Sequence, residues 1–417
     1  MASILLSINA GSSSVKVSVF EIASGTPREL AVIQVDGLTA PPAKLKYTRG
    51  DHKIKDQELS DIKGQEDAFT FILKHLEQDS GLHQLDDRKS IEYACHRVVH
   101  GGDYDTPQVI DTSTFKHLEE LSDLAPLHNG AALALVTSVI NSLPNAKNIA
   151  FFDSAFHSSI PIHIRTYPIS PEIAQKNKLR KYGFHGLSYA FIAKTVAEHL
   201  GKPVSELNII ALHLGSGASA CAIRGGKSLD TSMGLTPLAG LPGATRSGSI
   251  DPSLVFHYTH EAGRLAPHES KHMHITQAEV ILNKESGWKA LTGTTDFGDI
   301  TRRADEGDQA CKLAFDILVD RVLAFVAAYY VSLRGQVDAL VFAGGIGEKG
   351  ARLREAVVDG VGCLGFAIDK ARNDSPEEDG PVADVGAKDA RQKVLVCRTD
   401  EQLEMARQCV DGFVGKE

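Results

Sequence analysis

Hydrophobic residues cluster along this chain in the patterns of short β-strands and of helices. A strand over 4–8 runs into a Gly-Ser turn and returns as a second strand over 15–19. Further strands are predicted at 31–35 and 44–47, and apolar residues recur with helical spacing over 66–78. The opening region is therefore expected to mix helices with strands.

Buried strands that end in glycine or polar residues continue through the rest of the chain. The stretch 91–102 predicts a strand leading into a glycine loop, and 337–343 predicts one leading into Gly344 and Gly345. We expect further strands at 148–153 and 393–397, helices at 129–140, 189–200, 311–332 and 400–410, and a solvated loop at 373–386. This alternation indicates an α/β protein.

The strand-turn-strand unit occurs twice, 204 positions apart. Residues 4–19 align with 208–223 without a gap, so that the Gly-Ser pairs at Gly11 and Gly215 coincide. Backbone N–H groups and hydroxyls in such a turn can surround a phosphate, although either turn alone could be an ordinary hairpin. Neither turn is a Walker loop, because no G-x-x-x-x-G-K-[ST] occurs and each turn leads into a strand. The repeat predicts a phosphate-handling enzyme built from two similar halves.

Composition excludes several classes of protein. A chain of 417 residues with 42% hydrophobic residues can form two or three domains with sizeable cores. Its net charge of −9 and its lack of a long basic run argue against nucleic-acid and membrane partners. The six cysteines are scattered without a C-x-x-C pair, and no signal or membrane-spanning segment is visible. We therefore expect a cytoplasmic protein with reduced thiols.

Short motifs along nearly the whole chain resemble those of one known family. They include Asn-Ala-Gly-Ser-Ser-Ser-Val-Lys at 9–16, His-Arg-Val-Val-His-Gly-Gly at 96–102 and Gly-Gly-Ile-Gly-Glu at 344–348. Further motifs stand at 125–129, 152–157, 180–186, 230–234, 245–248 and 399–401. The set resembles the acetate and propionate kinases of the acetokinase family, within the superfamily of actin, sugar kinases and Hsp70. The resemblance is closest to the acetate kinases.

The resemblance implies an α/β fold of two duplicated βββαβαβα lobes, of the actin-like ATPase or RNase H-like type, with a central cleft. Residues 1–153 and 397–417 are expected to form an N-terminal lobe, and residues 154–396 a C-terminal lobe that binds nucleotide and mediates a homodimer. The implied reaction is reversible, Mg²⁺-dependent transfer of a phosphoryl group from ATP to acetate, giving acetyl phosphate and ADP by a direct in-line mechanism.

Direct transfer between two anions requires positive charge around the moving group, and Arg97 and Arg246 lie beside glycine-rich turns. Arginine forks suit carboxylate and phosphate oxygens, although an arginine chosen at random is more often structural. The resemblance implies catalytic roles for both arginines and for His185, which would steady the transferring group. It also implies that Asp153 orients acetate or an arginine, although this carboxylate could equally cap the next segment.

Most of the 17 histidines are expected to be structural. We expect this role for His100, His157 and His213, and leave His128 between a structural and a functional role. His213 also matches a nucleotide-side position of the family, so both interpretations remain open for it.

The resemblance implies a small acid-binding pocket. It matches Arg97, Val99, Leu127, Phe184 and Pro237 to the family's acetate site. One methylene is worth about 1–3 kcal/mol in such a pocket, so propionate should be a poorer substrate without being excluded.

A magnesium site is implied at Asn9 and Glu401. Mg²⁺ prefers oxygen ligands and keeps several waters, so one or two protein groups suffice. Without the resemblance, Asn9 could be a turn residue and Glu401 an ordinary helix N-terminal glutamate.

The implied nucleotide-binding residues fall into four segments. They are Ser12, Ser14 and Lys16; His213, Gly215, Ser216 and Gly217; Asp296, Phe297 and Gly298; and Gly344, Gly345, Ile346, Gly347 and Lys349.

The chain departs from the family mostly on this nucleotide side. Ser216 and Lys349 replace asparagines, Ala244 replaces a glycine, and Gly298 replaces an arginine that could stack on the base or bond to it. We therefore expect ATP to be used with weak discrimination among bases, with GTP or ITP within about tenfold.

Three alternatives remain open, and the first is a short-chain acid kinase that prefers propionate. Relaxed adenosine contacts would also fit a kinase that uses pyrophosphate, although the retained Gly-Gly-Ile-Gly-Glu at 344–348 favours a nucleotide. A non-catalytic nucleotide switch of the same superfamily would need an added partner-binding domain, and the sequence shows none.

Overall fold

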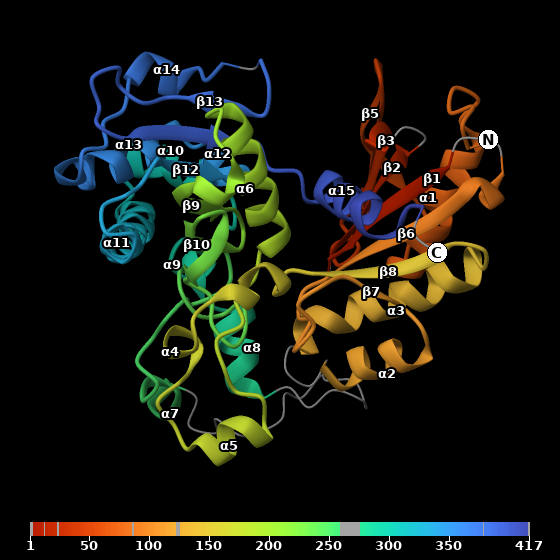
Figure 1. The fold of residues 1–417 in the computed structure, drawn as a ribbon, viewed down its shortest axis with the longest axis horizontal. Helices are drawn as coiled ribbons and strands as arrows, with labels where there is room; N and C mark the ends of the chain where they lie inside the picture. Colours follow the sequence, from red (N-terminus) through yellow and green to blue (C-terminus); the bar gives the residue numbers. More distant parts are fainter. Residues whose placement is uncertain are drawn as a thin grey trace. The chain divides into compact units, whose positions relative to one another are not determined.

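The computed structural model describes residues 3–11, 13–22, 25–85, 87–121, 126–258, 276–377 and 379–415. Contacts divide the chain into two compact units, which we call unit 1 (Met1–Ala155 with Asp400–Glu417) and unit 2 (Phe156–Thr399). Each unit contains a β-sheet covered by helices (Figure 1). The predicted α/β class is confirmed.

Unit 1 has an eight-stranded sheet among its described residues, in the order β5-β4-β3-β2-β1-β6-β8-β7. The strands are β1 (Ile4–Ala10), β2 (Ser14–Glu21), β3 (Arg28–Asp36), β4 (Ala43–Arg49), β5 (His52–Leu59), β6 (Ile91–Val98), β7 (Gln108–Val109) and β8 (Lys147–Phe152). Strands β1, β6 and β8 run parallel, and the other pairs are antiparallel. The carboxyl ends of β1, β6 and β8 therefore lie along one edge of the sheet.

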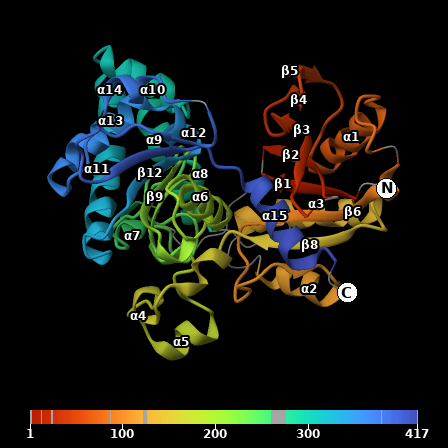
Figure 2. The same ribbon diagram turned by 45° about the horizontal axis from the view of Figure 1, so that its top comes forward.

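Helices cover both faces of this sheet (Figure 2). They are α1 (Gln65–Gln78), α2 (Thr112–Leu121), α3 (Pro126–Ser142) and α15 (Glu401–Phe413). Ile8 and Val17 belong to the apolar core that α1 and α3 share. Because strand residues alternate between faces, Ser7 and Ser18 point the other way, where both hydrogen-bond Gln402 of α15. These bonds fix the first turn of α15 to β1 and β2.

Unit 2 has a six-stranded sheet among its described residues, in the order β11-β10-β9-β12-β14-β13. The strands are β9 (Asn208–Leu214), β10 (Ala218–Arg224), β11 (Lys227–Thr231), β12 (Ala339–Ala343), β13 (Val382–Asp384) and β14 (Lys393–Cys397). The helices are α4 (Ile162–Arg165), α5 (Pro171–Lys176), α6 (Gly186–His199), α7 (Leu254–Tyr258), α8 (Gln277–Lys284), α9 (Gly287–Thr292), α10 (Phe297–Asp305), α11 (Gln309–Ser332), α12 (Gly344–Lys349), α13 (Ala351–Gly360) and α14 (Lys370–Asp374).

The two faces of the unit 2 sheet differ in character. Leu212 and Ala220 face an apolar core that includes Leu318 of α11. His213 of β9 and Ser219 of β10 point to the opposite face and hydrogen-bond residues at the start of α6. The sheet therefore presents polar groups toward α6 and apolar groups toward α11.

The two sheets share one topology. The order β3-β2-β1-β6-β8 in unit 1 matches β11-β10-β9-β12-β14 in unit 2, with the same parallel and antiparallel pairs. Strands β1 and β9 begin 204 positions apart, as do β2 and β10. The predicted duplication is confirmed.

The gapless alignment of the two hairpins nevertheless requires a correction. In unit 1 the last pair is Ala10 with Val15, so four residues form the turn. In unit 2 the last pair is Leu214 with Ala218, so three residues form it. The sequence offset is the same for both strands, but the pairing register differs by one residue.

The expectation of a solvated loop at 373–386 is wrong in part. Asn373 is buried in α14, and β13 adds an antiparallel edge strand beside β14. The Asp- and Glu-rich composition of this segment does not predict β13, which forms because it pairs with the buried strand β14. Over the described residues, no helix has both the length and the apolar character that crossing a bilayer requires.

Candidate active site

The edge of the unit 1 sheet carries a charged cluster centred on Arg97. Arg97 is the last but one residue of β6, and Asp153 follows β8 directly. The guanidinium donates from Nε and Nη2 to both oxygens of Asp153, at 3.1 and 2.6 Å. It also donates from Nη1 to Oδ1 of Asn9 at 3.2 Å and lies 3.5 Å from Oε2 of Glu401. The structure therefore brings four predicted site residues together.

Strand alternation explains why these groups meet. Asn9 stands opposite Lys16 on the face of the sheet that carries α15, since Ser7 and Ser18 on that face bond to α15. Glu401 is the first residue of α15, whose N-cap Asp400 accepts from the two N–H groups that follow Glu401. The helix start thus delivers Glu401 to the strand ends.

Arg97 is held as a cation. Burial opposes its charge, but the carboxylates of Asp153 and Glu401 outweigh that effect and raise the pKa of Arg97 above its usual range. The Asp153 side chain is only 1% exposed, whereas that of Arg97 is 19% exposed. The buried carboxylate therefore orients the arginine, which keeps part of its surface available to a ligand.

The residues predicted to bind the acid belong partly to unit 1 and partly to unit 2. Val99 follows Arg97 in unit 1 and is half-buried. Leu127 lies in α3, but its side chain is outside the described part of the structure. Phe184 and Pro237 are buried in unit 2.

Two stacked histidines lie on the α6 face of unit 2. The rings of His185 and His213 are 4.2 Å apart at an angle of 27°. Nδ1 of His185 lies 2.8 Å from Oγ of Ser219, which is 2.5 Å from the hydroxyl of Tyr189. His185 has a left-handed backbone with φ 60°, directly before the first residue of α6. Stacking and hydrogen bonding together fix the orientation of this ring.

His213 is held by a second set of neutral groups. Its Nδ1 lies 2.7 Å from Oγ of Ser188, which is 2.9 Å from Oγ1 of Thr399. Thr399 donates from its backbone N–H to Glu348 at 3.3 Å. These contacts connect His213 to the segment that follows β12.

Arg246 lies against the second Gly-Ser turn. Its Nη1 donates to the carbonyl of Pro237 at 3.1 Å. A Cβ at Gly217 would come within 2.8 Å of Arg246 Nη2, so the side chain crosses the backbone of the turn. Only glycine at 217 leaves this space to the guanidinium.

A cavity of about 800 Å³ opens beside the same turn in unit 2. Its volume is typical of small-ligand sites. Eight predicted nucleotide-binding residues line it: Gly215, Ser216, Asp296, Phe297, Gly298, Gly345, Ile346 and Lys349. The sequence missed Thr295, Thr301, Gly350, Ala351 and Arg352, which also line it and lie beside or one helical turn beyond predicted residues.

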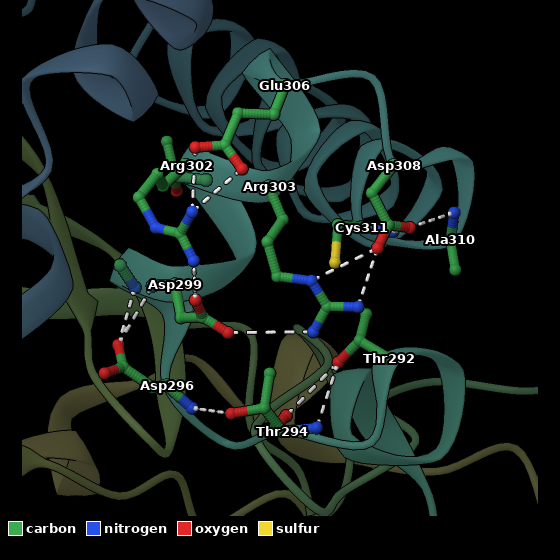
Figure 3. Close-up of polar contacts among 12 residues, drawn as sticks. Thr292, Thr294, Asp296, Asp299, Arg302, Arg303, Glu306, Asp308, Ala310 and Cys311 are labelled. Atoms are coloured by element: carbon green, nitrogen blue, oxygen red, sulfur yellow. Dashed lines mark hydrogen bonds and ion pairs between the residues drawn. The ribbon is translucent and has the colours of Figure 1, made fainter.

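One wall of the cavity is the start of α10, whose polar contacts are drawn in Figure 3. Oδ1 of Asp296 accepts from the N–H groups of Gly298 and Asp299, at 2.9 and 3.2 Å. Arg302 and Arg303 both contact Asp299 and extend toward residues at the end of α10 or the start of α11. These ion pairs hold α10, of which Phe297, Gly298 and Thr301 line the cavity.

The opposite wall is α12 and the start of α13. Gly344 has φ 74°, and a Cβ there would lie 2.7 Å from the carbonyl of Leu214, so only glycine fits between the parallel strands. Arg354 is buried and donates to the carbonyls of Gly347 and Glu348 at 2.8 Å, although burial lowers its pKa to about 10. These hydrogen bonds from Arg354 hold the end of α12 in place.

The remaining predicted nucleotide residues do not line this cavity. His213, Gly217, Gly344 and Gly347 lie near it in the sequence but support neighbouring groups. Ser14 and Lys16 belong to unit 1. Ser12 lies outside the described residues.

Three other histidines are buried structural groups. Nε2 of His96 lies 2.8 Å from Asn148, and the ring of His157 lies between Ser228 and the Phe184 carbonyl, at 2.7 and 2.9 Å. Burial lowers the pKa of both His96 and His157 to about 4. Nδ1 of His100 accepts from the Gly102 N–H. His128 has its side chain outside the described part.

Comparison with known proteins gives one consistent relationship. Residues 4–407 match the model of the acetokinase family. The chain is 55% identical to a probable acetate kinase of Chaetomium globosum, over 99% of this chain and 98% of that protein. Its fold matches the crystal structures of a Francisella tularensis propionate kinase (TM-score 0.84, 33% identity) and of Porphyromonas gingivalis acetate kinase (TM-score 0.82, 32% identity), each over 97% of this chain and 98% of the other. The chain therefore belongs to the acetokinase family.

Proposed function

We propose that this protein is an acetate kinase that transfers the γ-phosphoryl group of ATP directly to acetate. A carboxylate oxygen of acetate forms the new P–O bond while the bond to the β-phosphate oxygen breaks and ADP leaves. The observation that carries the proposal is family membership over residues 4–407 together with the Arg97 cluster, whose cation is oriented by a buried carboxylate.

Arg97 binds the acid in this mechanism. Its guanidinium offers donors in a fixed plane that suits a carboxylate, and Asp153 holds that plane. Val99, Leu127, Phe184 and Pro237 are assigned to the methyl group of acetate. A small apolar pocket favours short acids, so propionate is expected to react less well.

Arg246 and His185 stabilise the transferring group. A loose phosphoryl transition state spreads negative charge over three oxygens, so fixed donors lower its energy. Arg246 is positioned by Pro237 and by the gap at Gly217, and His185 is positioned by Ser219 and by stacking on His213. Asp153 acts through Arg97.

The cavity beside Gly215 and Gly345 binds the nucleotide. Glycine backbones at the strand ends approach the phosphates, while α10 and α13 border the remainder of the ligand. Ser12, Ser14 and Lys16 of the first turn, and His213, Gly217, Gly344 and Gly347, are assigned to the phosphate side. Because Gly298 has no side chain that could contact the base, we expect weak discrimination among the bases of nucleotides.

Asn9 and Glu401 are the proposed Mg²⁺ ligands. Both present oxygen atoms, the atoms that Mg²⁺ prefers, in the same cluster at Arg97. The Asn9 carbonyl can accept from Arg97 and still offer its second lone pair. When bound, the ion would neutralise charge on the phosphates.

Homodimer formation through unit 2 is part of the proposal. Ile162 of α4 and Ile173 of α5 are 70% and 54% exposed, and the two short helices are neighbours in unit 2 (Figure 1). Exposed apolar side chains of this size support a protein contact. Sedimentation equilibrium should give twice the chain mass of 44.8 kDa. A cytoplasmic location is supported by six free cysteines.

Trapping with hydroxylamine tests the activity directly. Acetyl phosphate reacts to form acetohydroxamate, so acetate with Mg-ATP should give a signal, and propionate a weaker one. The same assay with pyrophosphate in place of ATP tests whether pyrophosphate is the phosphoryl donor. If acetate, propionate and butyrate at millimolar concentration all give no hydroxamate, the proposal is refuted. If pyrophosphate is the best donor, the assignment of ATP as the donor is wrong.

A further inference from the structure

Arg352 lies where a guanidinium can reach the ligand in the unit 2 cavity, although it is outside every motif that identified the family. It belongs to the first turn of α13 and lines the cavity together with Gly298 and Lys349. Its guanidinium lies 5.6 Å from the ring centroid of Phe315 and 3.6 Å from Oδ1 of Asp305. Its side chain is 51% exposed.

Arg352 contacts α10 beyond the α10 residues that line the cavity, because it pairs with Asp305. Gly298 and Thr301 are one helical turn apart, and Asp305 follows four residues later on the same face. The cavity is lined along α10 as far as Thr301, and Arg352 lines it from α13. If the phosphates of a ligand lie at Gly215 and Gly345, its base can extend along this wall toward Arg352.

Gly298 leaves room for such a contact. A Cβ at this position would meet only the Asp296 carboxylate, at 3.2 Å. The neighbouring arginines of α10 are engaged elsewhere, since Arg302 pairs with Asp299 and Glu306, and Arg303 with Asp299 and Asp308 (Figure 3). Among the described lining residues, Arg352 is the one that carries a guanidinium.

The contacts that hold Arg352 are weak enough to exchange for a ligand. Both members of the Arg352–Asp305 pair are more than half exposed, and ion pairs of this kind contribute little. The stem can stay on Phe315 while the fork turns toward the cavity.

We propose that Arg352 reads the purine base and strengthens the binding of 6-oxopurine nucleotides, which brings them close to ATP. A guanidinium only donates hydrogen bonds. Guanine and hypoxanthine offer two acceptors on one edge, O6 and N7, which match its fork, whereas adenine offers N7 beside a donor amino group. Arg352 would thus supply, from α13, the base contact that Gly298 cannot make, and it would be the reason that GTP and ITP are accepted. This inference rests on the proposed function, because it requires a nucleotide in the cavity.

Calorimetric titration with ADP, GDP and IDP tests the inference apart from turnover. Arg352→Leu should weaken GDP and IDP binding at least about fivefold more than ADP binding, and Arg352→Lys should do the same because it keeps the charge but loses the fork. Arg302→Leu is the matched control, since it removes an arginine of similar exposure that does not line the cavity. In kinetics, the ratio of kcat/KM for GTP to that for ATP should fall by the same factor.

The possible outcomes distinguish a failure of the proposed nucleotide binding from a failure of base recognition by Arg352. If the unaltered protein binds none of the three nucleotides, the nucleotide-binding function fails. If it binds them and Arg352→Leu weakens all three equally, or none of them, Arg352 does not read the base. Full rescue by Arg352→Lys, or a loss confined to GDP without IDP, would also overturn the inference, since charge alone or the 2-amino group would then decide.

Discussion

The β1–β2 hairpin of unit 1 pairs Asn9 with Lys16, whereas the equivalent hairpin of unit 2 pairs His213 with Ser219. Next to the first pair lies an ionic cluster in which a buried Asp153 holds Arg97. Next to the second lie neutral hydroxyl and imidazole groups. One duplicated sheet topology therefore supports two kinds of chemistry, and the difference resides in side chains at the strand ends.

Removal of Asp153 should cause the largest change. Asp153→Ala removes the shortest ionic contact of Arg97 and leaves this mostly buried cation with Asn9 and the more distant Glu401, which costs about 3 kcal/mol of folding free energy. Ser219→Ala in unit 2 removes the neutral hydrogen bonds to His185 and Tyr189 and should cost about 1–2 kcal/mol. Urea unfolding of both variants, followed by circular dichroism, measures the contrast. Equal losses would mean that the ionic and the neutral clusters do not differ energetically.

Acid should weaken both units through one buried histidine each. His96 in unit 1 and His157 in unit 2 have folded pKa values of about 4, below the ordinary value of about 6.5. The unfolded chain therefore binds protons first as pH falls, and stability is lost between pH 6.5 and 4, by about 3 kcal/mol for each residue.

Unfolding free energies measured across this pH range test the effect. In His157→Gln, the loss of unfolding free energy between pH 6.5 and 4 should be smaller than in the unaltered protein by the contribution of one histidine. A slope that is unchanged in this variant would assign the acid sensitivity to other groups.

Loss of either arginine should lower turnover strongly. Arg97→Ala and Arg246→Ala should each lower kcat at least about 10²-fold, because both are assigned to charge in the transfer step. Arg97→Ala also removes the cation that pairs with Asp153, so Arg97→Lys, which keeps the charge, is measured beside it. An unaltered kcat in either alanine variant would remove that arginine from the site.

Alanine in the glycine turns gives a smaller and more local contrast. Gly217→Ala places a methyl group 2.8 Å from Arg246 Nη2, so it should displace the side chain and lower kcat about tenfold without changing Tm. Gly11→Ala in the first turn meets Ser14 Oγ at an ordinary 3.5 Å and should change kcat less than about threefold. Equal effects would show that the two turns constrain their neighbours alike.

Sequence alone predicted much of this comparison, and the remainder has physical causes. The repeat of 204 positions predicts the duplicated strands, and the family resemblance predicts Arg97, Asp153, Asn9 and Glu401, which the structure brings together. The one-residue register difference was hidden because both turns are rich in Gly and Ser and fit either length. Arg352 was missed because only packing of α13 beside α10 brings it to the cavity.

Our central proposal is that the cavity of unit 2 binds the adenosine part of the nucleotide, whereas Arg97 of unit 1 binds the carboxylate of the acid. The most direct test is the Kd for ADP, measured by calorimetry in two variants. Gly345→Val adds a side chain where nothing lies within 4 Å of a Cβ, on the cavity wall, so it should weaken ADP at least about tenfold while the protein stays folded. Arg97→Lys should leave the Kd for ADP within about threefold. Comparable losses of ADP binding in both variants, or none in Gly345→Val, would contradict this proposal.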